Sequence, residues 1–183
     1  QRNIAKTIRQ TINKEKITSV YKVKNETVKF GHFAKSYVKS YTVCDDLGNM
    51  FRDGNISNPI FYEIIGKDKN EIFSYYLNKA KTMLGDLGAS VTVYDNYSDK
   101  RVFLTIDGSS GFSLNGDDII SVFSDGTNKV KNEGYISVPI LLLATQLGGK
   151  KLDAFDIYLP HIYCIMGFKA VARIPWIEKY KPG

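Results

Sequence analysis

The sequence predicts an α+β fold in which helices flank a mixed, mostly antiparallel, twisted sheet. Short segments rich in β-branched and aromatic residues alternate with apolar stripes at helical spacing. Asp107-Gly108 and Asn115-Gly116 separate short apolar runs, and such pairs are the strongest local signal for β-hairpins. An apolar segment near 137–147 lies between two predicted strands, and a helical crossover of this kind joins parallel neighbours.

The first half of the chain predicts these elements in order. Residues 1–16 carry an apolar stripe at Ile4, Ile8 and Ile12 and predict a short helix. Residues 17–44 alternate with period two and predict two or three strands, and residues 45–59 are dense in turn formers and predict a loop. A helix is expected to begin at an Asp68 N-cap, with Glu71 three residues on, and to end before Gly85 and Gly88.

The second half begins with a predicted meander of four strands, at 90–94, 101–106, 110–114 and 118–124. A polar loop then leads into the crossover helix, which Gly148-Gly149 ends. A strand at 151–155, a short helix at 159–166 and a strand at 168–174 complete the prediction. Gly167 suits the C-terminal end of that short helix, because left-handed backbone favours glycine.

Composition indicates a globular protein with no membrane partner. The chain has 183 residues with 43% hydrophobic and 13% aromatic side chains, which is enough for a sizeable core. The longest apolar run, 136–147, is too short to span a bilayer and contains polar residues. No signal-peptide pattern opens the sequence, and Cys44 and Cys164 have no disulfide-framework spacing, so a cytoplasmic location is expected. Because position 1 is Gln, we expect either a processed start or a segment of a longer chain.

The positive charge is concentrated at one end of the chain. Residues 1–58 contain 11 basic and 5 acidic residues, whereas residues 59–183 contain 14 of each. We therefore predict a basic, β-rich N-terminal extension at 1–58 and a second domain at 59–183. Within 14–41, lysines alternate with aromatic residues, a mixture that suits nucleic acid or a protein partner. The same alternation is typical of half-buried strands with lysines on the solvated face, and both interpretations stay open.

The C-terminal sequence resembles a known family. Residues 148–176, GGKKLDAFDIYLPHIYCIMGFKAVARIPW, are similar to the end of a GCN5-related N-acetyltransferase (GNAT), whose Y-x-x-x-G-F signature would fall on Tyr163 to Phe168. With SGFSLNGDDIISVFS upstream, residues 68–178 resemble GNAT-like domains of phage and mobile-element proteins. The resemblance implies a GNAT-like fold, acetyl-CoA as co-substrate, an amine acceptor, and a place in the cytoplasm or in a phage virion.

The resemblance also implies a set of site residues. Tyr163 would be the general acid that protonates the departing CoA thiolate, and Asp156 would stand where most members have Asn. A loop leading into a helix N-terminus suits a pyrophosphate, because unpaired backbone N–H groups gather there. The cofactor residues expected on this strand and loop are Val122, Phe123, Ser124, Gly126, Lys129, Lys131 and Gly134, together with Asp156.

The general base stays open among four carboxylates. They are Asp125, Glu133, Asp153 and Asp156, with Glu133 and Asp156 taken as catalytic candidates beside Tyr163. His161 lies near Tyr163 in sequence, whereas His32 is distant, so a zinc site is not expected. The function predicted is transfer of an acetyl group from acetyl-CoA to an amine. The alternative is a non-catalytic GNAT-like structural or nucleic-acid-binding module, because residues 124–137 lack the family's Q/R-x-x-G-x-G/A loop.

Overall fold

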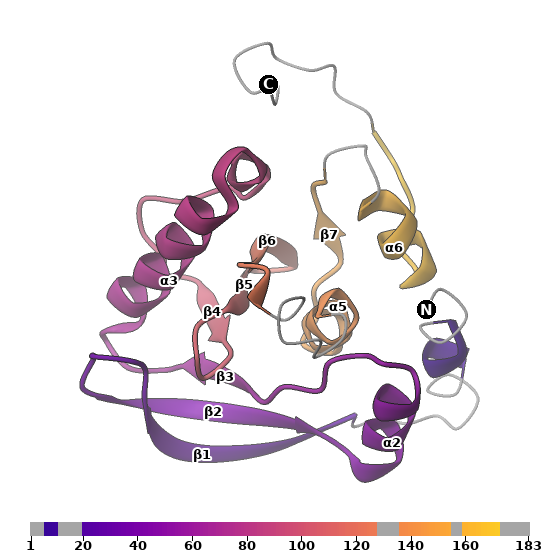
Figure 1. Ribbon diagram of the computed structural model, residues 1–183, viewed down its shortest axis with the longest axis horizontal. Helices are drawn as coiled ribbons and strands as arrows, with labels where there is room; N and C mark the ends of the chain where they lie inside the picture. Colours follow the sequence, from indigo (N-terminus) through magenta and orange to yellow (C-terminus); the bar gives the residue numbers. More distant parts are fainter. Residues whose placement is uncertain (1–5, 11–19, 128–135, 155–158, 173–183) are drawn as a thin grey trace.

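In the computed structural model, seven strands of the described residues form one sheet in chain order (Figure 1). The structure describes residues 6–10, 20–127, 136–154 and 159–172. Every neighbouring pair is antiparallel except the last, which is parallel. The strands are β1 (Tyr21–Lys29), β2 (Lys35–Val43), β3 (Phe61–Ile64), β4 (Arg101–Leu104), β5 (Ser110–Asn115), β6 (Asp118–Ser124) and β7 (Lys151–Leu152).

Helices flank this sheet, so the predicted α+β class with a mostly antiparallel sheet is confirmed. They are α2 (Asp45–Asp53), α3 (Lys69–Leu84), the 3₁₀ helix η1 (Gly85–Ser90), α5 (Ser137–Gln146) and α6 (Leu159–Ile165). Residues 6–10 are also helical, within the predicted N-terminal helix. No described helix is both long and apolar enough to cross a membrane.

The hairpins form where local turn chemistry predicts them. Gly108 and Gly116 have φ values of 67° and 62°, which is the left-handed conformation that the turns of the β4–β5–β6 meander require. Residues 17–44 supply β1 and β2, which pair through nine residue pairs from Tyr21 with Val43 to Lys29 with Lys35. The crossover through α5 is confirmed as well, since β6 and β7 lie side by side and parallel.

The two faces of the sheet carry separate hydrophobic cores. On one face, α3 buries Ile72, Phe73, Tyr76, Leu77 and Ala80 against strand residues that include Val102 and Phe123. On the other face, α2 and α5 pack on a layer that includes Tyr41, Phe61, Phe103 and Phe112. Figure 1 shows α3 on one side of the central strands and α5 with α6 on the other. Val138 to Ala144 of α5 are all buried, as expected of a helix enclosed on all sides.

Several predicted elements are wrong. Residues 45–53 form α2 instead of a loop, because Leu47 and Phe51, one helical turn apart, are fully buried. Residues 90–94 form no strand, and residues 168–172 of the predicted last strand form none either. β7 covers only Lys151 and Leu152, and β3 was not predicted. Asp68 is the N-cap residue of α3, as predicted, but its carboxylate accepts a hydrogen bond from Ser36 Oγ and makes no side-chain cap hydrogen bond.

Residues on both sides of Asn58 belong to the same sheet and core. β2 pairs with β3 through Tyr41 and Phe61, and Phe51 of α2 lies in the same core cluster as Phe61. The predicted boundary therefore falls between two elements that pack together, α2 and β3.

Candidate functional site

The parallel strands β6 and β7 separate after a very short ladder. Only Asp118 with Lys151 and Ile119 with Leu152 pair. Beyond these pairs a cavity of about 80 Å³ lies between the two strands. Its lining includes Ile119, Ser121 and Val122 of β6, Leu152 and Asp153 at β7, Val91 and Thr92 before β4, and Tyr163 of α6. β6 from Ile120 onward and residues 153–154 after β7 lie outside this ladder, and the cavity lies between them.

A β-bulge in β6 forms one wall of this cavity. Gly111 of β5 pairs with Phe123 and Ser113 pairs with Ile120, so Phe112 faces both Ser121 and Val122. Ser121 has φ 50°, a left-handed conformation that is unusual for a residue other than glycine. Bulges of this kind leave the extra residue outside the ladder and redirect its neighbours. The bulge therefore turns backbone polar groups of β6 away from β5, at the place where the cavity begins.

Buried hydroxyl groups hold Ser121 in this conformation. Ser121 Oγ donates to Thr92 O (2.7 Å) and lies 2.7 Å from Tyr97 Oη. Since the single Ser121 hydroxyl proton goes to Thr92, Tyr97 donates to Ser121. Tyr97 Oη also accepts from Tyr94 N (3.0 Å), and Tyr97 N donates to Asn70 Oδ1 of α3 (2.7 Å). The bulge is thus tied through Tyr97 to the segment before β4 and to α3.

We expect Tyr97→Phe to lower the free energy of unfolding by about 1–2 kcal/mol. Tyr97 is fully buried, so the change removes a donor from Ser121 and an acceptor from the Tyr94 N–H without access to replacement water. Urea unfolding followed by fluorescence measures the effect. Tyr37→Phe is the control, because that side chain is 73% exposed. Equal unfolding midpoints for Tyr97→Phe and the unaltered protein would contradict this role of the hydroxyl.

Tyr163 of α6 lines the cavity. The side chain is buried and lines the cavity, with its ring edge-on to Phe168 at 6.3 Å between centroids. α6 ends at Ile165, and Gly167, two residues on, has a φ of 102°, which confirms the predicted glycine-favouring backbone at this helix end. The Phe168 N–H then donates to Tyr163 O (3.0 Å), which turns the chain back over the helix end. Local turn chemistry therefore fixes where Tyr163 stands.

Two carboxylates lie near the point where β6 and β7 separate. Asp153 lines the cavity. Asp118 is the first residue of β6, directly after the turn between β5 and β6. Burial, followed by the negative charge of Asp153, raises the pKa of Asp118, while Lys151 opposes the rise. Asp153 was among the predicted carboxylates, whereas Asp118 was not.

The three predicted cofactor residues on β6 have different surroundings in the structure. Val122 lines the cavity. Phe123 points to the opposite face, where it packs against Phe73 of α3 (6.0 Å between ring centroids), so its side chain is a core residue. Ser124 pairs with Ser110 at the end of the strand. The cause is strand alternation, which sends neighbouring side chains to opposite faces.

The start of the predicted phosphate loop is a tight turn. Asp125 Oδ1 accepts from Thr127 N (2.8 Å), and Gly126 has φ 87°. Asp125 is thus engaged in its own turn. The remaining predicted residues, Lys129, Lys131, Glu133, Gly134 and Asp156, lie outside the described residues, as does Phe155. The side chain of His161 is outside them too.

A second cavity, of about 240 Å³, lies between the segment that enters β3 and the turn between β4 and β5. The turn between β4 and β5 lines it through Thr105, Ile106 and Ser109, and Ile136 lines it just before α5. Asp125 N donates to Ser109 O (2.9 Å), which places this cavity beside the start of the predicted phosphate loop. Within the described part of the chain, no group of three His, Cys, Asp or Glu side chains could hold a metal ion.

Comparisons of the chain with protein-family models, with curated proteins and with solved structures found no match. The resemblance to the GNAT family therefore stays a prediction. Sequence reasoning missed Ser121, Thr92 and Tyr97, which come together only in the folded chain. The segment that contains Thr92 resembled a strand, and no local pattern distinguishes Ser121 from its neighbours in β6.

Proposed function

We propose that the protein is a GNAT-like N-acyltransferase that moves an acetyl group from acetyl-CoA to an amine. One observation carries the proposal: two parallel strands separate at a bulge, and a buried tyrosine from the following helix faces the cavity between them. This arrangement offers backbone hydrogen bonds, enclosure and a proton donor in one place. Thioester aminolysis needs these three features and no metal.

The size of the cavity fits the reactive end of the co-substrate. A volume of about 80 Å³ is smaller than the roughly 150 Å³ cavity that holds benzene, so it suits an acetyl thioester and little more. In this proposal, the amide groups of the CoA arm pair with the backbone of β6 beyond Ile119 and of residues 153–154, as an added strand does. Val122 and Leu152 supply apolar contacts on either side of such a ligand.

The chemistry of the transfer follows from these groups. The neutral amine attacks the thioester carbonyl carbon, a C–N bond forms, and the C–S bond breaks. In this proposal, backbone N–H groups at the bulge stabilise the negative charge that develops on the carbonyl oxygen. Tyr163 donates its hydroxyl proton to the departing thiolate.

Asp153 is the candidate general base among the described carboxylates, because it lines the cavity. It would accept the proton that the attacking amine loses. Asp156 and Glu133 stay predicted catalytic residues, and Lys129, Lys131 and Gly134 stay predicted phosphate contacts.

We expect the purified protein to bind acetyl-CoA, and CoA itself, with micromolar Kd. Isothermal titration calorimetry measures the binding directly. At a ligand concentration 100-fold above Kd, the fold should gain about 2.7 kcal/mol in stability, which thermal unfolding with and without ligand detects.

A cavity-filling variant makes this test specific. Val122→Trp should abolish binding, because the larger side chain occupies the space between β6 and β7. Val23→Trp is the matched control, since Val23 is 56% exposed on β1, away from the cavity. Failure of the unaltered protein to bind at millimolar acetyl-CoA, or equal loss of binding in both variants, would rule out this site.

A further inference from the structure

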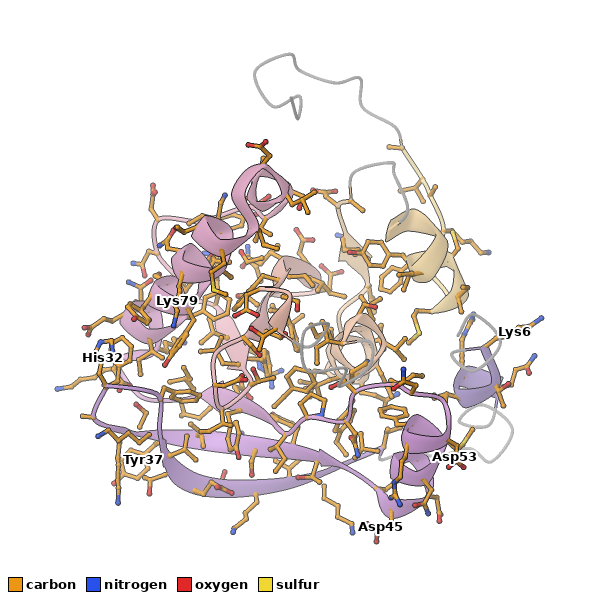
Figure 2. The ribbon with its side chains drawn as sticks, in the orientation of Figure 1. Lys6, His32, Tyr37, Asp45, Asp53 and Lys79 are labelled. Atoms are coloured by element: carbon orange, nitrogen blue, oxygen red, sulfur yellow. The ribbon has the colours of Figure 1, made fainter. Side chains whose placement is uncertain are left out.

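The turn end of the β1–β2 hairpin carries an exposed, positively charged face. On β2, Lys35, Tyr37 and Lys39 are exposed and alternate with the buried Ser36, Val38 and Ser40. Lys29 lies directly opposite Lys35, so it shares their face. Lys29, Lys35, Tyr37 and Lys39 are called the hairpin surface below. Figure 2 shows Tyr37 pointing away from the ribbon at this end of the molecule.

The positions of two lysines of the hairpin surface destabilise the folded sheet. Lys29 and Lys35 are Cα partners in adjacent strands, and like charges in directly opposed positions destabilise a sheet. Neither forms an ion pair with a residue that the structure describes. This arrangement is unfavourable for the isolated protein, but a bound anion would relieve it.

Nearby carboxylates do not neutralise the hairpin surface. Glu63 lies opposite Lys39 but is buried and engaged by Arg101 and Tyr41. Glu26 lies on the other face of β1, where it bonds Ser40 and lies near Lys24. The hairpin from Tyr21 to Val43 contains five lysines and one glutamate, so an acidic ligand is favoured.

Tyr37 distinguishes this surface from a merely basic one. Its ring is 73% exposed between two lysines of the same strand face. An exposed aromatic ring flanked by lysines on a sheet can stack an unpaired base while the lysines contact the backbone. A duplex hides the faces of its bases, so this surface favours single strands.

We propose that the hairpin surface binds single-stranded nucleic acid, with a base stacked on Tyr37 and phosphates held by Lys29, Lys35 and Lys39. The proposal rests on the exposed face of the hairpin alone. It is independent of acyl transfer and of the cavity between β6 and β7.

The test is fluorescence anisotropy with labelled dT20 and rU20 as probes. We expect Tyr37→Ala to weaken binding about tenfold, the effect of losing one stacked base. In the double variant Lys29→Ala and Lys35→Ala, the logarithm of the association constant should fall less steeply with the logarithm of salt concentration. The magnitude of that slope should decrease by about 1.4, because each phosphate contact on a single strand contributes about 0.7. The stronger of the two probes identifies DNA or RNA as the preferred strand.

Matched controls separate this site from general electrostatics and from unfolding. Lys22→Ala combined with Lys24→Ala removes the same charge from the opposite face of β1 and should change affinity little. The thermal midpoint of the Lys29/Lys35 variant should not fall, since the change removes a repulsive pair. Unchanged affinity of Tyr37→Ala, equal weakening by both lysine pairs, or equally tight binding of polyglutamate would each overturn the proposal.

Discussion

Replacing Tyr163 with Phe is expected to lower kcat of the proposed acetyl transfer about 100-fold while leaving the Kd for acetyl-CoA nearly unchanged. A positioned general acid contributes roughly 100-fold to 10,000-fold, and the substitution removes only the hydroxyl. The buried ring stays in place against Phe168 and continues to line the cavity. An effect confined to kcat is the result expected when an interaction acts in the transition state alone.

Release of free CoA thiol measures this turnover, with poly-L-lysine and spermidine as amine acceptors. Tyr75→Phe is the control, because Tyr75 is exposed on α3 beside the β1–β2 turn. Equal turnover by Tyr163→Phe and Tyr75→Phe would contradict the role of Tyr163 as acid. If acetyl-CoA binds but no variant differs from the unaltered protein, the non-catalytic alternative is favoured.

The parts of the fold that the sequence predicts depend on local interactions. Gly108 and Gly116 determine their turns through backbone conformation, and the stripe of α3 is set by spacing along one helix. α2 was mistaken for a loop because its turn-forming residues outnumber its apolar ones, and burial of Leu47 and Phe51 decides the outcome. The four residues of β3 carry too short a pattern to recognise, and their pairing with β2 and β4 defines them as a strand.

The candidate site also has one part that local sequence predicts and another part that depends on contacts between distant residues. Tyr163 stands before a helix end that Gly167 marks, so a local motif could indicate it. The bulge at Ser121 depends on Thr92 and Tyr97, which come 29 and 24 residues earlier in the chain. Such a conformation exists only when distant groups are brought together, and no spacing rule along β6 predicts it. The basic residues near the N-terminus were predicted as one group, yet the strand register places Lys22 and Lys24 on one face and Lys35 on the other.

The β-sheet also contains an ion pair with a buried carboxylate, which the sequence did not indicate. Glu63 of β3 is buried, and Arg101 of β4 donates to both its carboxylate oxygens, from Nε to Oε2 (2.7 Å) and from Nη2 to Oε1 (2.9 Å). Tyr41 of β2 donates to Oε1 as well (2.7 Å). Burial by itself would raise the pKa of Glu63, but the hydrogen bonds from Arg101 and Tyr41 outweigh it and lower that pKa. These three side chains join three adjacent strands.

We expect Glu63→Gln to lower the free energy of unfolding at pH 7 by about 2–3 kcal/mol. Removing one partner of a fully buried pair costs roughly 3–5 kcal/mol, and the Arg101 side chain, at 42% exposed, recovers part of this through water. Glu71→Gln is the matched control: it removes an exposed carboxylate from α3 and should change stability by less than about 0.5 kcal/mol.

The pH dependence of this difference gives the sharper test. The folded-state pKa of Glu63 lies below its ordinary value of 4.5. The ionised carboxylate therefore stabilises the fold fully above about pH 4.5, and this contribution is lost as the pH falls through the folded-state pKa. Urea unfolding from pH 7 to pH 3 should therefore show a constant difference between the unaltered protein and Glu63→Gln down to about pH 5, followed by convergence. A difference that stays the same at pH 3 would mean that shape, and not charge, makes Glu63 important to the sheet.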